Sequence, residues 1–217
     1  MAPELIYCAD GNPRFAAAAV AAGWRYGARL PAKVYQSVHF ADQDWRRPDR
    51  DGYMRALRAH RPAVATVLDW ERAEQFGEVM SWAAEASRHV ARVVVVAKVS
   101  GLCSLIPRAV GGAEVLIGYS VPTAYGGSEI CLWEIGRRPV HLLGGSPQKQ
   151  LSLARYLNVV SVDGNMAHQQ AHRCRYWSRK KGPHGHWRQL GGAPAPGDNL
   201  RCFARSLENI ATAWRAA

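Results

Sequence analysis

Short apolar runs alternate with helical patterns along the chain, with about 20–30 residues from one apolar run to the next. The runs expected to form strands cover residues 5–8, 33–38, 64–68, 93–96, 115–117, 140–143 and 159–162. Amphipathic patterns at 13–22, 48–60, 147–157 and 199–214, and one ending near residue 88, predict the helices. This spacing is typical of βα units, which form a parallel sheet or barrel. We therefore predict an α/β fold with a (β/α) TIM-type barrel in one domain over residues 1–217. Because only seven strands are evident, the barrel can be complete or incomplete.

The chain is organised around two apolar runs joined by a short helix, between Pro139 and Asn165. The first run ends at Gly144 and Gly145, where the backbone can turn sharply or approach a ligand. Ser146 and the proline after it are suited to the first turn of the helix. That helix returns the chain, so the two strands should be parallel. Asp163 then ends a buried strand, at the edge where parallel sheets and barrels hold their chemistry.

Composition and charge limit the class of protein and its partners. The chain has 217 residues, is 48% hydrophobic, and contains no charge-free apolar run of about 18 residues, so we expect no transmembrane span. No basic region precedes an apolar stretch at the start, which argues against a secretory signal. Five scattered cysteines without a CxxC pair favour reduced thiols and a cytoplasmic location. The net charge of +11 favours a polyanion as partner, nucleic acid before membrane.

The segment 164–197 contains no acidic residue and mixes basic with aromatic side chains. Its candidate nucleic-acid contacts are Arg173, Arg175, Tyr176, Trp177, Arg179, Lys180, Lys181, Trp187 and Arg188. Cations bind phosphates and flat rings stack on unpaired bases, so the segment is expected to contact nucleic acid. The alternative is a solvated basic loop whose rings pack against the barrel.

Several strands end in polar residues. Asp42 and Asp44 follow the second expected strand, Asp69 the third, Lys98 the valine run, and Asp163 the last. A single aspartate after a strand is often only a helix cap. In a parallel barrel, however, all these ends open on one face, so several carboxylates should meet there. Carboxylates brought close together raise the pKa of at least one of them, which separates an acid from a nucleophile.

These residues resemble those of the tRNA-guanine transglycosylase superfamily. Residues 139–147 and Val162-Asp163 are similar to its late strand, helix and nucleophile strand. Residues 65–71 and 40–45 resemble the strands that carry its other two aspartates, and residues 117–121 its glycine loop. The resemblance covers about residues 5–175 and is closest to the short DNA-acting phage and bacterial relatives that handle 7-deazaguanine bases.

The resemblance implies a role for each strand-end residue. Asp163 is the expected nucleophile, Asp69 the residue that reads the base, and Asp42 or Asp44 the general acid or base. Further base contacts are expected from Lys98, Gly118, Tyr119, Ser120, Gly144, Gly145 and Asn165. No cofactor is implied.

The chain also departs from that family. The CxCxxC-and-histidine zinc module of the tRNA enzymes is missing, which favours DNA over tRNA. Lys98 occupies the position of a glutamine in the family, and Val121-Pro122-Thr123 occupies the position where the family's glycine loop ends in an acidic residue. Both positions contact the guanine-like base in the family, so the target base can differ from guanine. A different zinc site could draw on His168, His172, Cys174, His184, His186 and Cys202. Their irregular spacing favours surface or nucleic-acid-contacting histidines, so no metal is predicted.

The leading hypothesis is a DNA glycosylase that excises a modified base, with the target base flipped out or unpaired. Exchange of a base for a 7-deazaguanine is the alternative. A non-catalytic DNA-binding barrel is a further one, which substitution of the aspartates would distinguish. A barrel metallohydrolase is disfavoured because the first strand carries no HxH pair. The target base, DNA against RNA, and the oligomeric state are left open.

Overall fold

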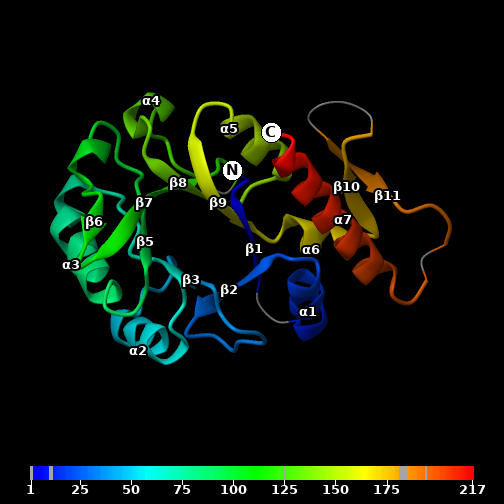
Figure 1. Cartoon of the computed structure of the whole chain (residues 1–217), viewed down its shortest axis with the longest axis horizontal. Helices are drawn as coiled ribbons and strands as arrows, with labels where there is room; N and C mark the ends of the chain where they lie inside the picture. Colours follow the sequence, from blue (N-terminus) through cyan, green and yellow to red (C-terminus); the bar gives the residue numbers. More distant parts are fainter. Residues whose placement is uncertain (1, 10–11, 125, 181–184, 194) are drawn as a thin grey trace.

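The computed structural model describes residues 2–9, 12–124, 126–180, 185–193 and 195–217. Within them, eight parallel strands close into a barrel, which confirms the predicted (β/α) TIM-type fold and adds the eighth strand that was not evident in the sequence (Figure 1). The strands are β1 (Glu4–Cys8), β2 (Arg25–Leu30), β3 (Phe40–Gln43), β4 (Val64–Thr66), β5 (Arg92–Val96), β7 (Ala113–Ser120), β8 (Pro139–Leu143) and β9 (Asn158–Gly164). Closure is complete because β1 pairs with both β2 and β9, and β5 pairs with β7. The two-residue β6 (Ala109–Val110) is antiparallel to β7.

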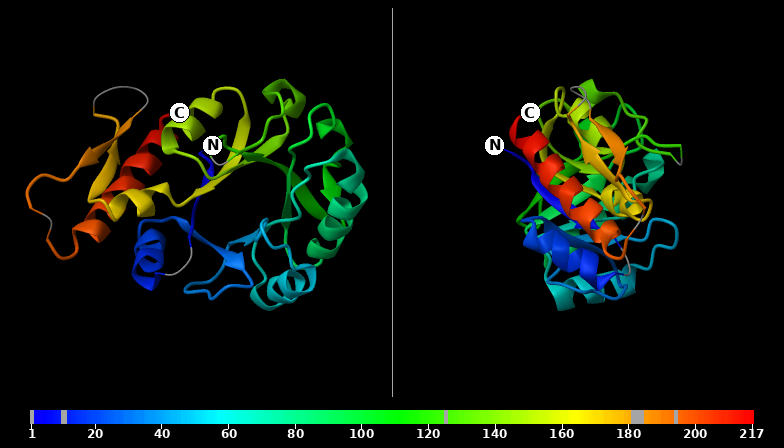
Figure 2. Two further views of the ribbon diagram at one scale, coloured as in Figure 1. Left: turned by 180° about the vertical axis from the view of Figure 1, so that it is seen from behind. Right: turned by 90° about the vertical axis from the view of Figure 1, so that its right-hand side faces the viewer.

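Helices surround the barrel, and a hairpin extends from it. The helices are α1 (Pro13–Ala21), α2 (Arg50–His60), α3 (Phe76–Ala86), α4 (Leu132–Ile135), α5 (Pro147–Leu153), α6 (Met166–Ala171) and α7 (Asp198–Arg215), with 3₁₀ turns at Ala73–Gln75 and Cys103–Leu105. Strands β10 (Arg175–Ser178) and β11 (His186–Gln189) form an antiparallel pair that lies beyond α7, outside the barrel (Figures 1 and 2). No helix among the described residues is long and apolar enough to cross a membrane.

Two layers of core hold the barrel together. The outer layer lies between strands and helices and includes the fully buried Trp70, Leu57 and Phe203. The inner layer fills the barrel itself, and its buried members are Ile6, Phe40, Val64, Val94, Val96 and Leu116. At the amino-terminal end of the strands, Glu4 binds Arg92 at 2.6 Å and His39 at 3.3 Å. The middle of the barrel is therefore a packed core, and its largest cavity opens at the carboxyl ends of the strands.

The strand predicted over residues 33–38 is wrong, and the strands on either side of it, β2 and β3, were not predicted. Residues 33–38 form a loop, although Val38 is buried there. The strand that completes the barrel is β2, which has no continuous apolar run because it carries Arg25 and Arg29. Arg25 is exposed and begins the strand, and Arg29 reaches its carboxyl end, so both charges lie near the ends of the barrel.

The unit around β8 and β9 is confirmed. The two strands are parallel, and Pro147 occupies the first turn of α5. The Ser146 hydroxyl accepts a hydrogen bond from the backbone N–H of Lys149. The helix ends at Leu153, four residues earlier than expected. This unit places Gly144 and Asp163 side by side at the mouth of the barrel, where their hydrogen bond joins the two strand ends.

Candidate active site at the barrel mouth

A cavity of about 600 Å³ opens at the carboxyl ends of the strands. The predicted site residues that line it are Asp42, Asp69, Lys98, Ser120, Gly144, Gly145 and Asp163. They come from β3, β7 and β9 and from the segments that follow β4, β5 and β8. The predicted convergence of strand-end carboxylates is confirmed for three aspartates.

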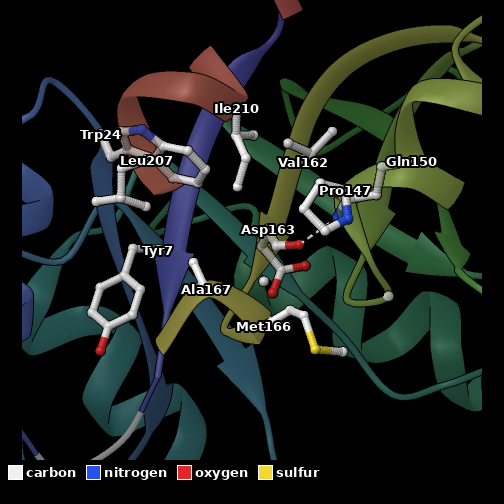
Figure 3. A pocket seen from close by; sticks show the side chains of 12 residues that line it. Tyr7, Trp24, Pro147, Gln150, Val162, Asp163, Met166, Ala167, Leu207 and Ile210 are labelled. Atoms are coloured by element: carbon white, nitrogen blue, oxygen red, sulfur yellow. Dashed lines mark hydrogen bonds between the residues drawn. The ribbon is translucent and has the colours of Figure 1, made fainter. Parts of the chain in front are cut away.

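Asp163 is fixed by its neighbours on β8 and α5. Its Oδ1 accepts hydrogen bonds from the backbone N–H of Gly144 at 3.2 Å and from Nε2 of His141 at 3.3 Å. The Gln150 amide donates to the backbone carbonyl of Gly144 at 2.7 Å and to that of Asp163 at 2.8 Å, and the bond to Asp163 is drawn in Figure 3. Among the described residues no hydrogen bond engages Oδ2 of Asp163, so this oxygen remains available for chemistry.

His141 supports Asp163 from inside the barrel. Its side chain is fully buried, and its ring stacks on Phe40 with 4.7 Å between centroids. Nδ1 lies 2.8 Å from the hydroxyl of Ser161, which is also fully buried. An ionised carboxylate only accepts, so in the neutral ring Nε2 carries the proton and Nδ1 accepts from Ser161. The chain Ser161–His141–Asp163 thus holds the carboxylate in one orientation.

Asp42 is held by a second network. The Thr66 hydroxyl donates to Oδ1 of Asp42 at 3.0 Å and accepts from the backbone N–H of Gln43 at 2.9 Å. Below them, the Tyr53 hydroxyl bridges the carbonyls of Thr66 and Ala41. Burial first, and then the negative charge of Asp163, raise the pKa of Asp42 to about 7, against the hydrogen bond from Thr66. Asp42 can therefore hold a proton at neutral pH.

Asp69 and Lys98 form an ion pair in the cavity wall. Nζ of Lys98 lies 2.7 Å from Asp69 and 3.0 Å from Glu71. Burial disfavours the ammonium, but these two carboxylates outweigh it and raise the pKa of Lys98. Burial raises the pKa of Asp69, and the ion pair with Lys98 opposes that rise. At the rim, Trp45 is 49% exposed, and Lys98 lies 5.5 Å from its ring centroid.

The cavity is acidic although the chain is basic. Among the described residues that line it are five acidic side chains, those of Asp42, Asp69, Glu71, Glu129 and Asp163, and one cation, that of Lys98. The chain as a whole carries +11. A phosphate is repelled by such a cavity, whereas an uncharged group with hydrogen-bond donors is accepted.

Four of the predicted site residues lie elsewhere. Asp44 belongs to the loop after β3, where Oδ1 accepts the N–H of Arg46, and it does not line the cavity. The Tyr119 ring packs into the outer core, because it points to the opposite side of β7 from Ser120. Gly118 lies inside the barrel against Val94 and Val96, where a side chain would clash. Asn165 lines a different cavity.

That smaller cavity, of about 120 Å³, adjoins the first. Asp42, Gly144 and Asp163 line both cavities. The remaining lining residues are Cys8, Ala9, Arg29, Gly164 and Asn165. A third cavity, drawn in Figure 3, lies between β9 and helices α5, α6 and α7 and measures only about 20 Å³. That volume holds about one water, so the third cavity is a packing gap.

The basic segment differs from the prediction in its aromatic residues. Tyr176 is 6% and Trp177 0% exposed, so neither ring can stack on a base. The backbone of Trp177 bonds to Ser206 and Asn209, which fastens β10 to α7. Packing of these rings, the alternative for this segment, is what the structure shows. Arg173, Arg175, Arg179 and Lys180 are exposed, Trp187 and Arg188 are partly buried, and Lys181 lies outside the described residues.

The histidines of the same segment do not build a metal centre with the other described residues, among which no group of three ligands is suited to a metal ion. His168 and His172 face each other with 2.9 Å between their Nε2 atoms, and Nδ1 of His168 lies 2.8 Å from the Tyr7 hydroxyl. Phe15 stacks on His168. His184 lies outside the described residues.

Sequence reasoning gave no role to His141, Thr66 or Arg29. A signal was present for the first two. His141 is a polar residue in the middle of an otherwise apolar strand, and Thr66 interrupts the short run before Asp69. Arg29 gave no such signal, because no strand was predicted over residues 25–30.

The profile of a family described as a family of unknown function (DUF6610) matches residues 19–215. The match therefore includes β2 to β9 and the three aspartates of the cavity. Comparison with the curated proteins gives no match.

Proposed function

Because the chain belongs to the DUF6610 family, whose function is unknown, we propose its function from the site itself: cleavage of the N-glycosidic bond of a modified base in DNA. The observation that carries this proposal is the pair of differently placed aspartates in one cavity. Asp163 has a fixed orientation and an Oδ2 that accepts no hydrogen bond from the described residues, and the pKa of Asp42 is about 7. This is the division of roles expected of a nucleophile and an acid.

The proposed reaction has two steps. In the first, Oδ2 of Asp163 bonds to C1′ of the sugar, the C1′–N bond breaks, and Asp42 gives its proton to the departing base. In the second, a water molecule attacks C1′, Asp42 takes a proton from the water, and the bond to Asp163 breaks. The products are the free base and an abasic sugar, and both aspartates return to their starting states.

The base is proposed to lie against Asp69 and Lys98. The carboxylate accepts hydrogen bonds and the ammonium donates them, and the two groups stand 2.7 Å apart. A purine-like edge with an N–H donor beside a carbonyl oxygen matches this pair. The transglycosylase superfamily, which the chain resembles, has a glutamine at the position of Lys98. In the proposed arrangement Lys98 and Asp69 together still recognise a base edge that carries both a donor and an acceptor.

The distribution of charge supports a nucleic acid as substrate. The acidic cavity favours an uncharged base over phosphate, while exposed arginines and a lysine lie on β10 and next to its two ends. A base inside a duplex cannot reach the cavity, so the target is flipped out or unpaired. We also propose that the substrate is DNA, that the protein acts in the cytoplasm, and that the chain forms a single domain.

Excision is preferred over base exchange. Exchange requires that water be kept away from the intermediate. Trp45 at the rim is half exposed, and the cavity of about 600 Å³ opens at the mouth, so water has access. Exchange for a 7-deazaguanine is the second candidate, supported by the volume of the large cavity and by the Asp69–Lys98 pair.

The test is to incubate the protein with DNAs that carry different modified bases, with and without free 7-deazaguanine. Abasic sites formed without added base support excision. Label incorporated only when a free base is supplied, without abasic product, supports exchange. Binding of DNA with neither product supports the non-catalytic barrel.

Two variants and a control make the assay specific. Asp163→Asn and Asp42→Asn should each lower turnover at least ~100-fold, within the range that single acid–base groups contribute. Asp44→Asn is the matched control, because Asp44 lies in the same loop region but outside the cavity. Full activity of Asp163→Asn on the true substrate would remove the proposed nucleophile.

A further inference from the structure

The two cavities at the mouth meet only at the reacting residues. Asp42, Gly144 and Asp163 line both, and no other described residue does. The larger cavity contains the Asp69–Lys98 pair and the smaller contains Arg29 and Asn165. A ligand that spans the two cavities therefore passes directly over the aspartates.

We propose that the smaller cavity is a pentose subsite, in which Asn165 and Arg29 bind oxygens of the sugar while the base occupies the larger cavity. This inference rests on the proposed function and deepens it. An N-glycoside has its base and sugar on opposite sides of one bond, and that bond must lie at the nucleophile. With the base against Asp69 and Lys98, the sugar is left to the other side of Asp163.

The lining of the smaller cavity suits a hydroxylated ligand. Four of its side chains are polar, those of Arg29, Asp42, Asp163 and Asn165, and the two apolar ones, of Cys8 and Ala9, are small. Hydroxyls both donate and accept, so they can bond to carboxylates and to a guanidinium at once. The volume of about 120 Å³ is several times the ~10–15 Å³ that one water needs, which leaves room for a ring.

Asn165 is oriented for this role. Its Oδ1 accepts a hydrogen bond from Gln169 at 2.9 Å, which leaves Nδ2 as a donor. Asn165 follows Asp163 by two residues, at the end of β9. Arg29 pairs in register with Asp42 across β2 and β3, so both side chains project to the same face of the barrel wall. Its guanidinium has five donors and can bond to the protein and to a sugar oxygen together.

The test uses binding of a pyrrolidine iminosugar, an imino-ribitol whose protonated ring mimics the charged sugar of glycosidic cleavage. Calorimetry on the wild-type protein should detect binding, and Asn165→Ala should weaken it about tenfold, the effect of one lost hydrogen bond. Asn158→Ala is the matched control, because Asn158 is exposed at the other end of β9. Asp69→Asn, in the base cavity, should leave the affinity within about threefold of the wild-type value.

Three results would overturn the subsite. The first is the absence of iminosugar binding by the wild-type protein. The second is equal affinity for unsubstituted pyrrolidine, which shows attraction of a cation to carboxylates without recognition of hydroxyls. The third is sensitivity of iminosugar binding to Asp69→Asn but not to Asn165→Ala. Imino-ribitol and its 2-deoxy form, compared side by side, show whether the subsite favours ribose or deoxyribose.

The readout separates this inference from the proposed reaction. If DNAs and nucleosides are not cleaved but the iminosugar binds with the expected dependence on Asn165, the reaction fails and the subsite stands. If bases are excised but the iminosugar affinity is the same in the wild-type protein and in Asn165→Ala, the proposed reaction is supported and the proposed subsite is wrong.

Discussion

Asp163 is hydrogen-bonded to His141, an imidazole that is fully buried inside the barrel. A histidine in that place has a cost, because its polar atoms need partners where no water is available. Ser161 and Asp163 supply them. The most direct explanation is that His141 orients the carboxylate, and this makes the first prediction.

Replacement His141→Phe should lower kcat at least tenfold with a small change in KM, because Asp163 keeps only the Gly144 N–H on Oδ1. It should also lower stability by about 1–3 kcal/mol, since the buried Ser161 hydroxyl loses its partner. The double variant His141→Phe/Ser161→Ala removes that hydroxyl and should recover part of the stability but none of the rate. Urea unfolding and steady-state kinetics measure the two effects. Recovery of kcat in the double variant would show that His141 serves packing alone.

The second prediction concerns the pH dependence of activity. Asp42 must carry a proton to protonate the leaving base, and its pKa is about 7. Activity should therefore fall as the pH rises through about 7. The positive charge of Arg29 lowers the pKa of Asp42, so Arg29→Gln should move this fall to higher pH. The control is Arg25→Gln, at the other end of β2. An unchanged alkaline limb in Arg29→Gln would separate that limb from Asp42.

The third prediction concerns stability. The pKa of Asp42 is raised in the folded state, from an ordinary value of 3.8 to about 7, so the unfolded chain loses its proton first. The contribution of Asp42 to the free energy of unfolding is therefore largest below about pH 4 and falls as the pH rises towards 7. Asp42→Asn does not titrate and should be more stable than the wild type at pH 8, by on the order of 2–4 kcal/mol. At pH 4 the difference should shrink. Denaturant titrations at pH 4 and pH 8 measure this difference, with Asp44→Asn as the control. A difference in stability that does not depend on pH would contradict the raised pKa of Asp42.

The sequence predicted the barrel because parallel strands buried on both faces give apolar runs at βα spacing. It found Asp42, Asp69 and Asp163 because all strand ends of a parallel barrel share one face. β2 was missed for a physical reason: the strand places Arg29 in a polar cavity at the mouth, so its pattern is not that of a core strand. The burial of Tyr176 and Trp177 depends on contacts with α7, about 30 residues later, which local composition cannot reveal.

The fourth prediction concerns recognition of the base. Lys98→Met removes the donor of the pair and leaves Asp69 without its ion-pair partner. KM for the modified base should rise at least tenfold, with kcat changed less, since neither residue touches the sugar in the proposed arrangement. Substrates whose base lacks the carbonyl acceptor should lose less than those that have it. Lys33→Met is the control, because Lys33 is exposed and lies outside the cavity. An equal loss for all bases would show that Lys98 only supports the fold of the mouth.

The last prediction concerns the surface that holds the nucleic acid. The exposed cations of the basic segment are Arg173, Arg175, Arg179 and Lys180. Each contact between a cation and a phosphate releases counterions, so log K should depend on log salt with a slope of about 0.9 per contact on duplex DNA and about 0.7 on single strands. Changing all four residues to glutamine should therefore weaken binding and flatten the slope by up to about 3.6 on duplex DNA and about 2.8 on single strands.

Changing the exposed arginines Arg55, Arg58, Arg61 and Arg88 to glutamine removes the same total charge from another part of the surface. If this control flattens the slope equally, net charge is responsible and the basic segment is no specific contact. Trp177→Ala provides the contrast within the segment. It should cost about 3–5 kcal/mol of stability, because the ring is fully buried, and leave the salt slope of the folded protein unchanged.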